Sequence, residues 1–233
     1  MANLPAKPVT AAVAAFLQQA GSVPALRPVA HRPGRLLFAV DATASRQPGW
    51  DLASHQQTEM FQAAAGLGGL EVSLAYWRGF GEFAATPFIT DSATLARRMA
   101  EVECLGGRTQ IGRALAHAEQ LAAQARLHAL VLVGDAVEEE PDALCHLAGR
   151  LGLRGTPVFA FQEGQDARVA GVLRQIAKLS GGAHAPFGAG SAAALRDLLG
   201  AVGAFAAGGH AALARLATPG ARTLLAQLPA PRR

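Results

Sequence analysis

Lysine, cysteine and aromatic residues are scarce in this chain of 233 residues. Two lysines stand against 19 arginines, and 6% of the residues are aromatic. The formal charge is +4, but the arginines are scattered and form no basic stripe interleaved with aromatics. Such a stripe is the usual mark of a nucleic-acid surface, so we expect no nucleic-acid partner.

The two cysteines, Cys104 and Cys145, do not have the spacing of zinc ligands, and two cysteines are too few for a disulfide framework. They indicate idle thiols in a reducing cytoplasm. No apolar run approaches the roughly 20 residues that span a bilayer, so no membrane segment is expected. The apolar patch Val9–Leu17 is interrupted by Thr10 and followed by Gln18, which favours an amphipathic helix over a signal peptide.

Hydrophobic residues are abundant, at 51%, and charged residues make up 16%, so a folded core is expected. The expected organisation is an N-terminal helix and extended lead-in over residues 1–34, a main domain over 35–206, and a marginal helix and tail over 207–233. Strands are predicted over residues 35–41, 71–77, 82–90, 129–135, 157–161 and 183–187. Helices are predicted over residues 50–65, 92–104, 110–126, 142–153, 167–179 and 192–206.

Strands that alternate with helices, with one hairpin, predict a doubly wound α/β fold. Its sheet is mostly parallel and six-stranded, with one antiparallel edge strand that Pro87 places at the border. In such sheets, ligands bind at the carboxyl edge, where successive connections leave to opposite sides. If the strands over 35–41 and 129–135 are neighbours, Asp41 and Asp135 flank that position.

Oxygen-bearing side chains gather at this predicted edge. Asp41, Thr43 and Ser45 follow the first strand at alternate positions, and Thr109 follows a pair of glycines at the start of a helix. Each residue alone has an ordinary explanation, because aspartate begins loops and threonine caps helices. Together they offer the oxygen ligands that hard cations such as Mg²⁺ prefer.

Three segments together resemble the metal-ion-dependent adhesion site (MIDAS) of von Willebrand factor A (VWA) domains. The resemblance covers about residues 35–205 by the order of the motifs and their place on strands. One departure is Ala136, where many members have glycine. The matching segments are Asp41-Ala-Thr43-Ala-Ser45, Gly106-Gly107-Arg108-Thr109-Gln110-Ile111-Gly112 and Gly134-Asp135.

The resemblance implies a three-layer α/β/α, Rossmann-like VWA fold of the stand-alone bacterial type. It implies Mg²⁺, or Mn²⁺, held by Asp41, Thr43, Ser45, Thr109 and Asp135. The family binds proteins through an acidic residue of the partner, and most members are not enzymes. We therefore expect a cytoplasmic, metal-dependent protein-interaction module that is a subunit or adaptor of a larger assembly, such as an ATPase or chaperone complex.

Charged neighbours of these residues suggest how a partner is oriented. Arg46 follows Ser45 and Arg108 precedes Thr109, so both are expected to rim the metal and attract an acidic partner. Glu138 to Glu140 are expected on the opposite lip, where they would repel misaligned carboxylates. The ordinary alternative for all of these charges is a solvated loop.

An enzyme is the main alternative. Asp41 and Ser45 have the spacing of the nucleophile and hydroxyl of haloacid-dehalogenase-like phosphohydrolases. That chemistry usually needs an acid two positions after the nucleophile, where Thr43 stands, and a lysine that holds the phosphate. The sequence has no lysine between Lys7 and Lys178. An α/β module with an inactive site is the remaining alternative.

Overall fold

The computed structural model describes residues 32–188 and 191–230. The helix expected around Val9–Leu17 lies outside these residues. In the described part of the chain, six strands form a single sheet. They are β1 (Gly34–Asp41), β2 (Leu70–Arg78), β3 (Glu82–Ala85), β4 (Ala129–Gly134), β5 (Val158–Glu163) and β6 (Ala183–Phe187).

The strand order is β3-β2-β1-β4-β5-β6, and every neighbouring pair is parallel except β2 and β3. The predicted mostly parallel sheet with one antiparallel edge strand is therefore confirmed. The chain moves outward from β1 to β3 and then returns to place β4 beside β1. The point where the connections leave to opposite sides consequently lies between β1 and β4.

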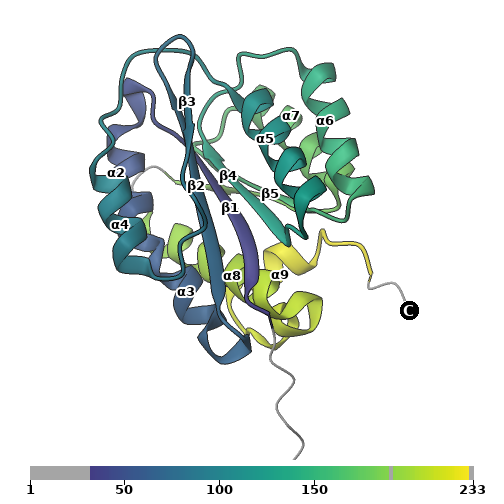
Figure 1. The fold of residues 1–233 in the computed structure, drawn as a ribbon. Coiled ribbons are helices and arrows are strands. Elements are labelled where there is room, and N and C mark those ends of the chain that lie inside the picture. The colour runs from purple at the N-terminus through teal and green to yellow at the C-terminus, as the bar shows by residue number, and fades with distance from the viewer. Residues whose placement is uncertain (1–31, 189–190, 231–233) are drawn as a thin grey trace, which may run out of the picture. The chain divides into compact units, whose positions relative to one another are not determined.

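Helices cover both faces of the sheet and give a three-layer α/β/α fold (Figure 1). One layer holds α2 (Gln47–Gln56), α3 (Thr58–Ala64), α4 (Ser92–Ala100), α8 (Ala192–Arg215) and α9 (Pro219–Leu225). The other holds α5 (Ile111–Gln124), α6 (Pro141–Leu153) and α7 (Ala167–Ser180).

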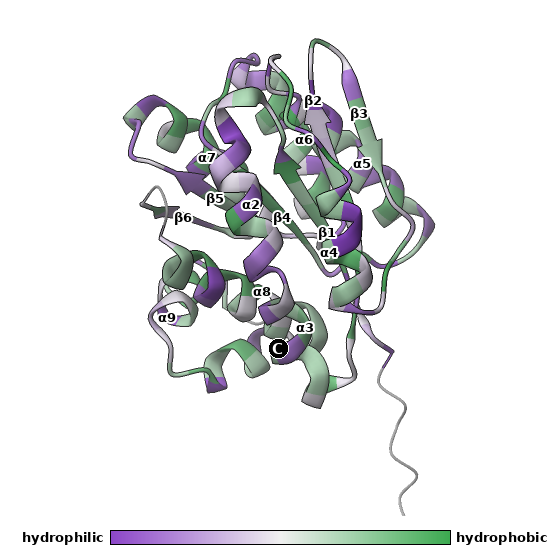
Figure 2. Ribbon diagram, turned by 90° about the vertical axis from the view of Figure 1, so that its left-hand side faces the viewer, coloured by the Kyte–Doolittle hydropathy of each residue, from purple (hydrophilic) through white to green (hydrophobic). Residues whose placement is uncertain are grey.

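The apolar run of β1 explains its central position. Leu36, Phe38 and Val40 pack into one core layer, whereas Leu37 and Ala39 pack into the other. Successive side chains of a strand point to opposite faces, so a strand covered on both faces is apolar at every position. Figure 2 shows the hydrophobic strands β1 and β4 in the middle of the sheet.

The helix predicted over residues 50–65 is divided in the structure. It begins earlier, at Gln47, with Pro48 in the first turn, and it is broken at Gln57 between α2 and α3. The Gln57 side chain is buried and donates a hydrogen bond to the Ser92 carbonyl at 3.0 Å. This hydrogen bond joins the residue between the two helices to a segment that is distant in sequence.

The start of α4 was predicted correctly, although the helix ends at Ala100 rather than near Cys104. Asp91 is the N-cap, and its side chain accepts a hydrogen bond from the Thr94 N–H at 2.8 Å. Such a bond satisfies a backbone donor that has no partner within the helix.

The C-terminal region differs from its expected marginal helix and tail. Helix α8 continues past Ala206 to Arg215, across a kink at Gly209, where φ is 68°. Leu213 in α8 and Leu224 in α9 are buried in the same core as β1. The part of residues 207–233 that the structure describes is therefore packed onto the domain.

Helix α8 is long and apolar enough to cross a membrane by length and composition, although no such segment was expected from the sequence. Its most apolar stretch is 56% buried inside the protein, and a core helix has the same composition. In the residues described here, no other helix has these properties.

Candidate metal centre

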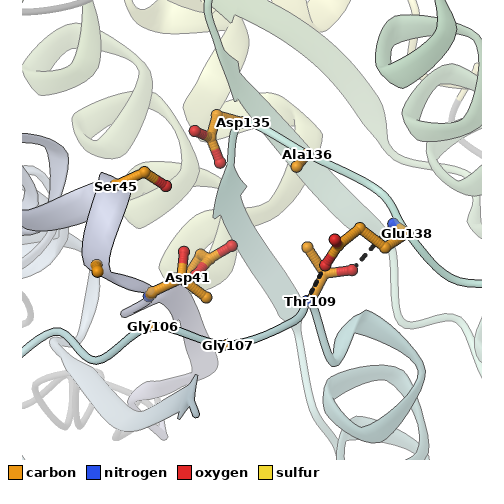
Figure 3. Close-up of a pocket in the computed structure, with 10 residues that line it drawn as sticks. Asp41, Ser45, Gly106, Gly107, Thr109, Asp135, Ala136 and Glu138 are labelled. Carbon is orange, nitrogen blue, oxygen red and sulfur yellow. Dashed lines mark hydrogen bonds between the residues drawn. The ribbon is translucent and has the colours of Figure 1, made fainter. Parts of the chain in front are cut away.

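A cavity of about 270 Å³ opens at the carboxyl edge of the sheet, where β1 and β4 end (Figure 3). The structure brings all five predicted metal ligands to this cavity. Val40 pairs with Val133 in the sheet, so Asp41 and Asp135 both lie at its edge. The lining residues are Asp41, Thr43, Ala44, Ser45, Gly106, Gly107, Thr109, Asp135, Ala136 and Glu138.

Asp41 lies at the base of the cavity and is only 1% exposed. Its Oδ1 accepts a hydrogen bond from the Thr43 N–H at 2.8 Å, whereas Oδ2 has no hydrogen-bond partner among the described residues. Burial raises the pKa of the Asp41 carboxyl, although the Thr43 hydrogen bonds and the charge of Arg46 lower it. A buried carboxylate oxygen without a partner is unfavourable, and a bound cation would offset this cost.

The two hydroxyl residues lie on the turn that follows β1. Thr43 is buried and precedes the 3-10 turn η1 (Ala44–Arg46), which contains the exposed Ser45. Figure 3 shows the side chains of Asp41, Ser45 and Asp135 pointing toward a common space. The turn therefore supplies neutral oxygen donors beside two carboxylates.

Gly107 allows the loop that precedes α5 to pass close to the turn between β2 and β3. A Cβ at Gly107 would collide with the backbone of Gly79, and the Arg108 N–H donates to the Gly79 carbonyl at 3.1 Å. On the other side, the Leu105 N–H donates to the Ala42 carbonyl at 3.0 Å. These contacts fix the backbone that leads to Thr109.

Glu138 lines the cavity, and Glu138 and Glu139 make contacts that were not expected. The Glu138 carboxylate accepts from the Thr109 N–H at 2.8 Å, and the Thr109 Oγ1 accepts from the Glu138 N–H at 3.0 Å. Glu139 accepts from the N–H groups of Ile111 and Gly112, both at 2.7 Å. These carboxylates accept hydrogen bonds from backbone N–H groups at the start of α5 that have no partner within the helix, and Glu138 also holds Thr109 in position. Their role is therefore structural in addition to the expected repulsion of carboxylates.

The two arginines expected at the rim have opposite environments. Arg108 is exposed, as expected. Arg46 is 2% exposed; its guanidinium pairs with Glu163 and lies 3.8 Å from an oxygen of Asp135. Arg46 is thus buried in ion pairs, and its expected position as an exposed rim residue is wrong. Sequence spacing gave no sign of Glu163, because the pairing depends on the position of β5.

The donor set fits a hard cation. Within residues 32–188 and 191–230, no group of three or more His, Cys, Asp or Glu side chains is placed to hold a metal. The set predicted here has two carboxylates, from Asp41 and Asp135, and its other three donors are hydroxyls. Oxygen donors favour Mg²⁺ or Mn²⁺ over zinc. The unpartnered Asp41 Oδ2 gives such an ion a place in the cavity.

Comparison by sequence gives no match to a protein-family model or to a curated protein. Comparison by structure gives many. The von Willebrand factor type A protein from Catenulispora acidiphila matches with a TM-score of 0.60 and 17% identity. The match covers 75% of this chain and 43% of that one, so this chain spans less than half of that protein.

Two further matches cover most of smaller chains. The SpRpn10 VWA domain has a TM-score of 0.56 and 12% identity, over 67% of this chain and 89% of that one. The vWF domain of the type V pili tip protein Mfa5 from Porphyromonas gingivalis has a TM-score of 0.56 and 10% identity, over 74% and 95%. Identities this low establish the fold alone, and the chain therefore has the von Willebrand factor A fold.

Proposed function

We propose that this chain is a metal-dependent protein-interaction module with a MIDAS. In this proposal Thr43, Ser45 and Thr109 bind Mg²⁺ or Mn²⁺ through their hydroxyls, and Asp41 and Asp135 bind it directly or through water. The observation that carries the proposal is the buried, unpartnered Oδ2 of Asp41 in a cavity lined by the other four residues.

The chemistry of the site supports an acidic partner. Neutral hydroxyls only partly offset the charge of the cation, and Mg²⁺ keeps some of its six ligands as water. A carboxylate of the partner can replace one water and gain a charge-assisted contact with the ion. The five residues would hold the ion in a cavity that is open to solvent, where a carboxylate of the partner could reach it.

The cellular setting is proposed by analogy with the fold. We propose a stand-alone domain of the bacterial type that acts as a subunit or adaptor of a larger intracellular assembly, such as an ATPase or chaperone complex. The cytoplasmic location agrees with Cys104 and Cys145, which are both free thiols. Burial raises the pKa of Cys104 to about 11, which keeps this thiol protonated and unreactive.

Phosphoryl transfer is not favoured. Helix α7 follows β5 and runs back from the carboxyl edge of the sheet, so Lys178 near its end lies at the opposite edge from Asp41. Thr43 cannot supply the proton that the acid of a haloacid dehalogenase supplies. We therefore propose that the chain is not an enzyme.

Titration calorimetry tests the metal site directly. We expect one site for Mg²⁺ or Mn²⁺ in the full chain, and its loss in Asp41→Ala and Asp135→Ala. Asp91→Ala is the matched control, because Asp91 caps α4 and lies outside the cavity. Unchanged metal binding in both cavity variants, with folding verified by circular dichroism, would overturn the proposal.

A further inference from the structure

Two large apolar side chains are exposed beside the cavity. Phe80, in the turn between β2 and β3, is 86% exposed, and Leu105, in the loop that leads into the cavity, is 43% exposed. Across the described part of the chain, only Leu153 and Leu179 are comparable. Those two lie at the C-terminal ends of α6 and α7, at the opposite edge of the sheet.

The turn that carries Phe80 is held in place from the cavity side. Three hydrogen bonds hold it: the Arg108 N–H donates to the Gly79 carbonyl (3.1 Å), the Gln110 amide donates to the Glu82 carbonyl (3.1 Å), and the Arg113 guanidinium donates to the Gly81 carbonyl. Because the backbone of the turn is already ordered, binding of a partner there costs little conformational entropy.

Both apolar residues directly adjoin, in sequence, glycines that lie at the same side of the cavity. Leu105 directly precedes Gly106, which lines the cavity. Phe80 directly follows Gly79, against which the cavity residue Gly107 packs without room for a Cβ. The β4 side of the cavity is lined by Asp135, Ala136 and Glu138. Two exposed apolar residues therefore adjoin one side of the cavity, and two carboxylates line the other.

We infer that Phe80 and Leu105 form a docking surface for a bulky apolar side chain of the acidic partner. The inference rests on the proposed function and specifies the partner: a protein segment with a large apolar residue within a few positions of its metal-binding carboxylate. Arg108, exposed in the same loop, complements the negative charge of such a segment. The apolar residue lies on the β2–β3 side, because the large exposed apolar side chains near the cavity are on that side, whereas the β4 side presents two carboxylates and only the small Ala136.

Two synthetic peptides test this surface in the presence of saturating Mg²⁺. One contains a single aspartate among glycines, and the other carries phenylalanine at both ends of the same sequence, because the direction of the chain on the surface is not fixed. Binding is followed by amide chemical shifts of the full chain. We expect the phenylalanine peptide to bind about tenfold more tightly, which is the order expected for partial burial of one aromatic side chain.

The variants separate the surface from the metal site. The preference for the phenylalanine peptide should disappear in Phe80→Ser/Leu105→Ser and persist in Leu153→Ser, while Mg²⁺ affinity stays unchanged in all. Equal binding of the two peptides to the wild-type protein, or an unchanged preference in the double variant, overturns the docking surface and leaves the proposed function standing. If neither peptide binds, or both bind equally well with chelator, the acidic-partner function itself fails, and the docking surface with it.

Discussion

The guanidinium of Arg46 forms a buried ion pair with Glu163, which is 117 positions away in sequence. The side chains are 2% and 11% exposed. Gly49 lies against the pair, and a Cβ there would collide with both partners. The pair ties the turn that carries Ser45 to the end of β5 and thereby helps to hold that turn at the candidate metal site.

Replacing Glu163 by glutamine should destabilise the domain. Glu163→Gln removes the closer of the two carboxylates beside the buried Arg46 guanidinium and leaves only Asp135, at 3.8 Å, as its counter-charge. This loss costs on the order of 3 kcal/mol of unfolding free energy. The double variant Arg46→Met/Glu163→Met removes both charges and should recover most of that loss. Urea unfolding measures both values.

The control for this prediction is an exposed ion pair. Glu101→Gln removes the partner of Arg98, whose side chain is 57% exposed, and should change the unfolding free energy by about 0.5 kcal/mol or less. If Glu163→Gln costs no more than Glu101→Gln, the buried pair does not stabilise the fold.

The two loop glycines should differ in their tolerance of a methyl group. Gly107→Ala forces the loop away from Gly79 and should cost about 1–3 kcal/mol of unfolding free energy and weaken Mg²⁺ binding. Gly106→Ala meets open space and should change neither quantity appreciably. Thermal unfolding and metal titration of the two variants check this, and equal effects would contradict the close approach at Gly107.

Charge at the rim should govern the rate of association with an acidic ligand. Arg108→Ala should slow association of an acidic peptide at low salt and have little effect on metal affinity, because exposed rim charges steer encounters. Arg126→Ala removes the same charge from an exposed position after α5, away from the cavity, and should leave the rate unchanged. Stopped-flow measurements over a range of salt concentrations should show the difference shrinking as salt rises; a difference that is independent of salt would exclude steering.

Stability should fall on mild acidification because of buried histidines. Burial, together with the charge of Arg174, lowers the pKa of His184, whose Nε2 lies 3.1 Å from the Gln162 Oε1. Below pH about 6.5, His184 therefore binds a proton more readily in the unfolded chain than in the folded protein. The contribution of His184 is therefore full above pH about 6.5 and declines as pH falls from there to the lower folded pKa.

His184→Gln should flatten the pH dependence of the unfolding free energy over this window, measured by urea unfolding. His55→Gln, at an exposed position, should leave the slope as in the wild-type protein. An unchanged slope in His184→Gln would assign the acid sensitivity to other groups; burial also lowers the pKa values of His117 and His128.

The sequence by itself determined which segments form the central strands and which residues follow them at the candidate site. Apolar runs that end in Asp41 and Asp135 specify two strands buried on both faces, and this pattern is local to each strand. The glycine pair before Thr109 likewise indicated a loop that leads into a helix. These signals lie within a few consecutive residues, so they can be read without knowledge of the fold.

The tertiary structure decided what each charge contacts. Arg46 and Arg108 carry the same side chain, yet Arg46 is buried because the end of β5 places Glu163 beside it. Glu138 and Glu139, in the loop after β4, accept hydrogen bonds from backbone N–H groups at the start of α5. The packing of Leu213 and Leu224 depends equally on how α8 and α9 cross the sheet. Ion pairs, caps and core contacts between distant segments depend on strand order and register, which no local pattern of residues encodes.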